Sequence, residues 1–182
     1  MLRIILRRHK LVALAVVVGI GLYLGFTLSA NATPLPARAY GPSSTRFTVA
    51  FGAQPEFSDL SDTPSSGTYF LNMAPQSSLY VASLASNTYE SVEVDAYPRP
   101  LTSKEIYRYI HVYLFGSHPT SWHGLAAAEM NVACHEGDTP QACPGRIAHL
   151  VVISGRSIYD LGAEKVSAGE VARFFGSFQL PG

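Results

Sequence analysis

The sequence predicts an α+β domain in which an antiparallel sheet packs against helices. Short segments that alternate apolar with polar residues recur along the chain, and this period of two is typical of strands. Two amphipathic segments with capping residues, one after residue 102 and one after residue 167, predict helices. Two of the strands are separated only by a tight turn at residues 154–156, so they must run antiparallel. Elements of this kind and order are typical of the α+β class.

The first 30 residues predict a membrane anchor. Residues 11–30 are uncharged and largely apolar, and a helix of that length spans about 30 Å, the thickness of the hydrocarbon core. The cations that precede this stretch are Arg3, Arg7, Arg8 and Lys10. By the positive-inside rule, residues 1–10 are then cytoplasmic, residues 11–30 form a transmembrane signal-anchor, and the remainder faces the outside.

Two further features belong to this N-terminal region. Ala30-Asn31-Ala32 resembles a signal-peptidase site, so cleavage after Ala32, which gives a secreted protein, is the alternative to an anchor. Gly21 and Gly25 have the small-residue spacing that packs two spans closely, and a homodimer is therefore one expectation. The alternative is that glycine is simply common in membrane spans.

The charge of the outer part excludes one class of partner. Nine Lys and Arg and thirteen Asp and Glu follow residue 30, which gives a net charge of −4 with neutral histidines. Nucleic-acid binding requires a basic face, so we expect no nucleic-acid partner. The partner that this location and charge favour is an envelope or membrane protein.

Residues 31–45 contain three prolines and predict an extended linker, after which residues 46–182 form the domain. Residues 46–51 alternate with Phe47, Val49 and Phe51 on one face, which predicts the first strand. Residues 53–67 are rich in Ser, Pro, Asp and Gly and predict a loop. Further strands are predicted at residues 69–73, 79–84 and 91–97.

A helix is predicted to begin at Thr102 or Ser103, with Ser103 as N-cap and Glu105 in the first turn. Its apolar face consists of Ile106, Ile110, Tyr113 and Leu114.

Residues 125–134 are interpreted as a strand, although their pattern also allows a helix. Residues 146–153 and 157–161 predict a hairpin. Ser167 and Glu170 then form a capping box for a last helix, whose apolar face consists of Val171, Phe174, Phe175 and Phe178.

The C-terminal segment resembles a known family. A hairpin at residues 146–161 with a Gly155-Arg156 turn and Tyr159 is followed by a helix that ends in Phe175-Gly176-Ser177-Phe178-Gln179-Leu180. This pattern resembles the end of Mog1/PsbP-like domains found in actinobacterial membrane-anchored and secreted proteins. The chain differs from the usual pattern in having Gly52 where a proline follows the first strand. The resemblance implies a Mog1/PsbP-like sandwich with a binding role, and it carries over no catalytic residue.

The two cysteines, Cys134 and Cys143, are separated by eight residues that include turn-forming Gly137 and Pro140. In a domain placed outside the cytoplasm, this spacing predicts a disulfide that closes a short loop. A metal site or a reactive thiol is the alternative.

Catalytic signatures are absent from the sequence, which contains neither a G-x-S-x-G elbow nor a glycine-rich nucleotide loop. His118 and His123 flank a predicted loop, but their spacing matches no closed zinc motif. We therefore expect no metal and no cofactor. The competing hypothesis is an envelope metal-dependent hydrolase that uses these loop histidines.

Aromatic residues in the middle third give the candidate binding site. Tyr107 lies four residues before His111 on the predicted helix, and Trp122 is adjacent to His123. Exposed Tyr and Trp are favoured at binding surfaces, whereas the alternative is that they pack beneath loops. The expected function is a non-enzymatic binding or assembly-support module of the cell envelope, with Tyr107, His111, Trp122 and His123 as binding residues.

Overall fold

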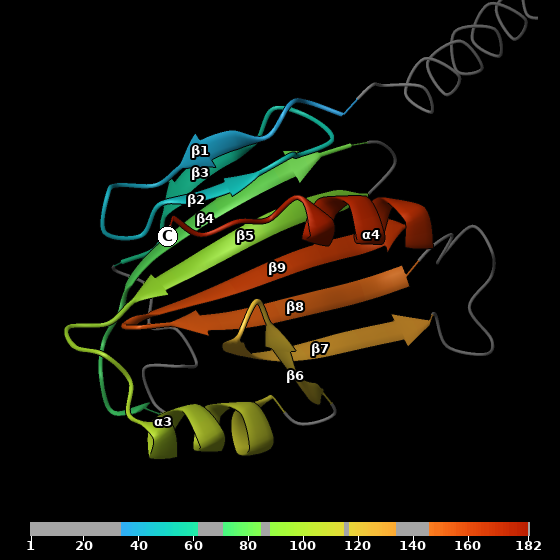
Figure 1. Cartoon of the computed structure of the whole chain (residues 1–182). Helices are drawn as coiled ribbons and strands as arrows, with labels where there is room; N and C mark the ends of the chain where they lie inside the picture. Colours follow the sequence, from blue (N-terminus) through green and yellow to red (C-terminus); the bar gives the residue numbers. More distant parts are fainter. Residues whose placement is uncertain (1–33, 62–70, 85–87, 115–116, 134–145, 182) are drawn as a thin grey trace, which may run out of the picture. The chain divides into compact units, whose positions relative to one another are not determined.

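The computed structural model describes residues 34–61, 71–84, 88–114, 117–133 and 146–181 (Figure 1). No helix within these ranges is long and apolar enough to cross a membrane. The expected anchor at residues 11–30 lies outside the described residues and stays a prediction.

A seven-stranded antiparallel sheet forms the centre of the domain, with strand order β3-β4-β5-β9-β8-β7-β6. A separate two-stranded ribbon is formed by β1 and β2 (Figure 1). The strands are β1 Arg38–Tyr40, β2 Phe47–Val49, β3 Glu56–Asp59, β4 Gln76–Ser83, β5 Tyr89–Ala96, β6 His118–Trp122, β7 Leu125–Ala133, β8 Arg146–Ser154 and β9 Ser157–Val166. With helices α3 Ser103–Arg108 and α4 Ala168–Gly176 added, the predicted α+β class is confirmed.

The sheet has two hydrophobic clusters because successive side chains of a strand point to opposite faces. Along β9, Tyr159 and Leu161 belong to one cluster, whereas Ile158 belongs to the other. The first cluster also contains Phe47, Val49 and Phe51, all of which have no exposed surface. The predicted one-faced pattern of this first strand is therefore confirmed.

Helix α4 covers the first of these clusters (Figure 1). Ser167 is its N-cap and forms the predicted capping box with Glu170. The four apolar residues predicted to form its inner face are all buried, although Phe178 lies two residues beyond the end of the helix: Val171, Phe174, Phe175 and Phe178. The chain then returns along β2, where Thr48 and Gln179 exchange two backbone hydrogen bonds of 2.8 Å. The C-terminal segment is thus tied to the N-terminal ribbon.

Helix α3 and the π-helical turn η1 (Tyr109–Tyr113) pack against the second cluster, to which Tyr109 and Ile110 contribute. The N-cap is Thr102, which forms a capping box with Glu105, so the prediction of Ser103 as N-cap was wrong. Thr102 is the residue whose hydroxyl lies three positions before the Glu105 amide, as this motif requires. The amide of Leu114 donates to the carbonyl of Tyr109 at 3.0 Å, which gives the five-residue spacing of a π-helix.

Several predicted loops contain strands. β3 lies inside the predicted loop at residues 53–67, and its four side chains are all exposed, so it lacks the alternation of a half-buried strand. β1 lies within the predicted linker at residues 31–45, and β6 occupies the predicted loop between His118 and His123. Four strands rather than three therefore separate the two helices.

Other boundaries also differ from the prediction. Residues 71–73, the described part of the strand predicted at 69–73, are not a strand: Leu71 is helical, and Asn72, with φ +53°, lies in a turn. The return strand β9 extends to Val166, five residues beyond the predicted end. The strand interpretation of residues 125–134 is confirmed by β7.

Candidate functional site

An open groove of about 330 Å³ lies between α4 and the strands β6, β7 and β8. The described part of its lining is mostly apolar, with one indole and one carboxylate. The residues that line it are Trp122, Glu129, Leu150, Ala168, Val171, Ala172, Phe175 and Gly176. We call this the α4–β6 groove. A concave, largely apolar surface with few polar groups is typical of binding sites in proteins.

The wall formed by α4 owes its shape to small residues. Ala168, Ala172 and Gly176 recur every four positions, so they share one side of the helix, and all three are exposed. Val171 and Phe175 lie deeper, with 6% of each residue exposed. Because the small residues do not fill the space between helix and sheet, the apolar groups beneath them form the base of the groove.

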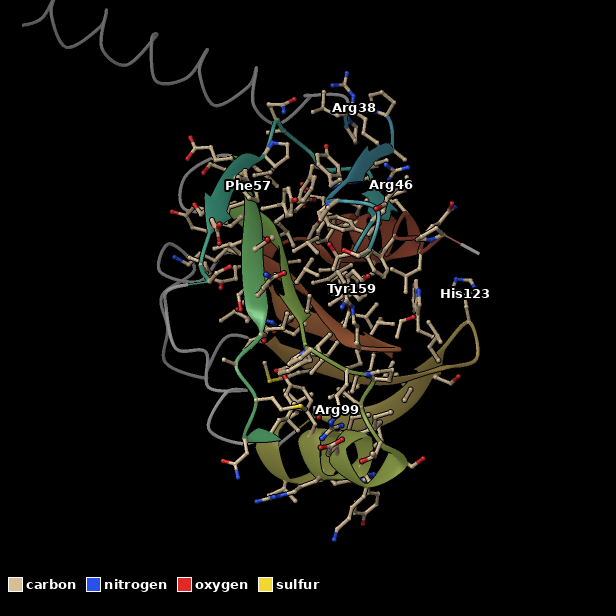
Figure 2. All side chains as sticks on the ribbon, turned by 90° about the vertical axis from the view of Figure 1, so that its left-hand side faces the viewer. Arg38, Arg46, Phe57, Arg99, His123 and Tyr159 are labelled. Carbon is tan, nitrogen blue, oxygen red and sulfur yellow. The ribbon has the colours of Figure 1, made fainter. Side chains whose placement is uncertain are left out.

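Trp122 forms part of the opposite wall at the end of β6. The next two residues, His123 and Gly124, have φ values of +49° and +83° and close a two-residue turn into β7. Two positive φ values are the geometry of a type I′ hairpin turn. His123 is exposed at the tip of this hairpin (Figure 2), and its ring meets that of Trp122 edge-on at 5.1 Å. The turn therefore holds the indole at the side of the groove.

Glu129 on β7 is the charged residue among those that line the groove. It is exposed, and within the described part of the chain no salt bridge engages it. Its partners in register are His118 on β6 and Leu150 on β8. The floor next to this carboxylate is apolar, because Leu150 is buried at 2% exposure.

The four predicted binding residues fall into two separate pairs. Tyr107 and His111 stack with ring centroids 4.2 Å apart, and Tyr107 is 63% exposed. This pair lies on α3 and η1, whose inner residues join the second cluster, whereas Trp122 packs against the first. On the same helical segment Tyr107 is exposed, whereas Tyr109 is buried.

A polar cluster interrupts the face of the sheet opposite to α4. Glu93 on β5 and Asp160 on β9 are direct partners across the two strands, and Asp160 accepts a hydrogen bond of 3.0 Å from Nδ1 of His149 on β8. Burial, followed by the charges of Asp95 and Asp160, raises the pKa of Glu93 to about 7. The hydrogen bond to Asp160 raises the pKa of His149, although burial opposes it.

Asp95 completes this cluster of carboxylates. It accepts a hydrogen bond from the hydroxyl of buried Ser77 on β4, its partner in register. Burial raises the pKa of Asp95, against the lowering effect of the bonds from Ser77 and Tyr97. Glycine at position 162 avoids a steric clash on this face, since a Cβ there would lie only 2.6 Å from Oγ of Ser91.

The histidines of the hydrolase hypothesis lie at the two ends of the β6 segment. His118 begins β6 and His123 follows its last residue, and both are exposed. Among the described residues, no group of three or more His, Cys, Asp or Glu side chains is placed to hold a metal ion. Cys134 and Cys143 lie outside the described residues, so their disulfide stays a prediction.

Comparison with protein-family models, with curated proteins and with solved structures finds no match to this chain. The function must therefore be inferred from the geometry of the sites. Sequence reasoning identified Trp122 through its residue type, but it missed Glu129 and the small residues of α4. The spacing of Ala168, Ala172 and Gly176 was the available signal. It indicates the wall of a groove only once α4 is known to lie beside β6 and β7.

Proposed function

We propose that this protein is a membrane-anchored, extracytoplasmic binding module of the cell envelope, without enzymatic activity, whose protein partner occupies the α4–β6 groove. The observation that carries the proposal is the groove itself. It is open, it is apolar at its base, and the half-buried indole of Trp122 stands at its side. Tryptophan is among the residues that contribute most to binding energy at protein interfaces.

The helix that forms the wall of the groove is tied to the rest of the domain by side-chain bonds, which lowers the cost of ordering it on binding. The capping box of Ser167 and Glu170 fixes the start of α4. Near its other end, Arg173 bonds to the buried carboxylate of Glu90 and to the carbonyl of Ala50. The residues that make these contacts are not among the described residues that line the groove, so they position the wall without occupying the site.

The location and family form the rest of the proposal. The cationic N-terminus and the apolar stretch at residues 11–30 support an anchor with the domain outside. The Gly155-Arg156 turn between β8 and β9, and the buried Phe174 and Phe178 in and after α4, support a Mog1/PsbP-like sandwich. We include a disulfide between Cys134 and Cys143 in the proposal, because disulfides form in domains that lie outside the cytoplasm.

Site-specific photo-cross-linking in intact cells tests this function. A photoreactive amino acid is placed at exposed Ala168 on the groove wall, and at exposed Ala39 on β1 as the matched control. We expect a discrete adduct with an envelope protein from position 168 and none from position 39. Equal adducts from both positions, or an adduct only from position 39, contradict the proposal.

A further inference from the structure

The chemistry of the α4–β6 groove specifies the kind of partner segment that fits it. The part of the partner that enters must cover Leu150, Val171 and Phe175, which form an apolar base. It must also lie beside Glu129, whose carboxylate has no salt-bridge partner among the described residues. An apolar segment alone would bring an uncompensated negative charge into a partly desolvated contact, which is unfavourable.

A positive side chain resolves this conflict. Lysine and arginine combine an apolar stem, which packs on apolar surface, with a charged end that remains at the rim. The indole of Trp122, which like Glu129 lies on the sheet side of the groove, provides a second attraction, since cations bind the faces of aromatic rings. Among the described residues that line the groove there is no Lys or Arg, so charge complementarity favours a cation and disfavours an anion.

From this arrangement we infer that the groove binds a protein segment in which a lysine or arginine is flanked by apolar residues, with the cation placed between Glu129 and Trp122. The inference rests on the proposed function and adds the chemistry of the partner. Its volume of about 330 Å³ is near the lower limit for ligand pockets, which suits one such side chain and its neighbours.

The chain carries its own reporter for a test. Trp122 is the single tryptophan of the sequence, so fluorescence excited at the indole band reports on this groove alone. The full-length protein in detergent micelles is titrated with three peptides: acetyl-Val-Lys-Val-amide, acetyl-Val-Gln-Val-amide and acetyl-Val-Glu-Val-amide. Free indole in the same micelles corrects for non-specific effects of the peptides.

We expect the lysine peptide to bind about five- to tenfold more tightly than the glutamine peptide, because exposed ion pairs and cation–π contacts are individually weak. The glutamate peptide should bind most weakly. Glu129→Gln should bring the lysine peptide to the affinity of the glutamine peptide. The matched control, Glu56→Gln, changes an exposed carboxylate on β3 outside the groove and should leave the preference intact.

Two results overturn the inference. One is equal binding of the lysine and glutamine peptides, and the other is the absence of any fluorescence change with all three peptides. The cross-linking experiment decides the proposed function separately. A groove-specific adduct together with no preference for lysine would refute the cationic partner and leave the binding module standing.

Discussion

Arg173 on α4 forms an ion pair with Glu90 on β5, a side chain with no exposed surface. The same carboxylate accepts the backbone N–H of Gly52 at 2.6 Å, and Arg173 also donates to the carbonyl of Ala50 at 2.6 Å. Burial raises the pKa of Glu90, and the bonds from Gly52 and Arg173 oppose this effect. The pair therefore joins the last helix, the sheet and the segment after β2 at one point.

Arg173→Met should lower the free energy of unfolding by about 3 kcal/mol at neutral pH, because it leaves the buried Glu90 charge without its partner. Urea unfolding followed by circular dichroism measures this loss. Arg173→Met combined with Glu90→Gln should recover part of it, since the uncompensated charge is then removed. If the double variant is no more stable than the single one, the charge of Glu90 is not the cause.

Glu93→Gln should stabilise the domain at pH 8 by about 1–2 kcal/mol, after allowance for solvent screening. The folded pKa of about 7 exceeds the ordinary value of 4.5, so the folded state binds the proton more tightly. Stability therefore falls as pH rises from 4.5 to 7, and the penalty is absent below 4.5. Urea midpoints at pH 4, 6 and 8 should show this decline in the wild type and a smaller decline in the variant.

Asp160→Asn should lower the pKa of His149, because it removes the carboxylate that favours the imidazolium. In the wild type, the stabilisation by this pair is complete below pH 6.5 and is lost as pH rises through the folded pKa. NMR titration of the His149 ring measures the change directly. The control variant Glu56→Gln, on the exposed strand β3, should leave the pKa of His149 unchanged. An unchanged His149 titration in Asp160→Asn would exclude the ion pair in solution.

Ser167→Ala should lower the free energy of unfolding by about 1 kcal/mol, because the hydroxyl that accepts the Glu170 amide is lost. Thr102→Ala makes the equivalent change at α3 and should have an effect of similar size. The two differ in their effect on the α4–β6 groove, since only Ser167 caps its wall. We expect peptide binding, measured through Trp122 fluorescence, to weaken in Ser167→Ala and to be unchanged in Thr102→Ala.

Sequence reasoning succeeded where one face of an element is buried. The alternation around Phe47, Val49 and Phe51 and the helical spacing of Val171, Phe174 and Phe175 both record burial, and the structure confirms both. It failed at β1 and β3, which lack a clear alternating pattern. The side chains of β3 are all exposed, and its pairing with β4 is made by backbone groups that every sequence possesses.

The sites were predictable only in part, for a related reason. Trp122 can be selected as a candidate binding residue from its residue type alone. Ala172, which lies across the groove from it, is fifty residues away in the chain. Likewise, the pKa of Glu93 is raised by its burial in the sheet and by the charges of Asp95 and Asp160, and the pairing of β5 with β9 places Asp160 opposite to it. Neither juxtaposition follows from local spacing, since both depend on the order of strands in the sheet.

The central position of β9 also has a kinetic consequence. β9 joins β8 through a two-residue turn, so this hairpin closes locally, whereas its pairing with β5 unites residues as distant as Glu93 and Asp160. Closing so long a loop before its contacts form slows folding. We therefore expect the β5–β9 ladder to form late in the rate-limiting step. Because β9 lies between two hydrophobic clusters, its amides should be among the slowest of the described residues to exchange with deuterium.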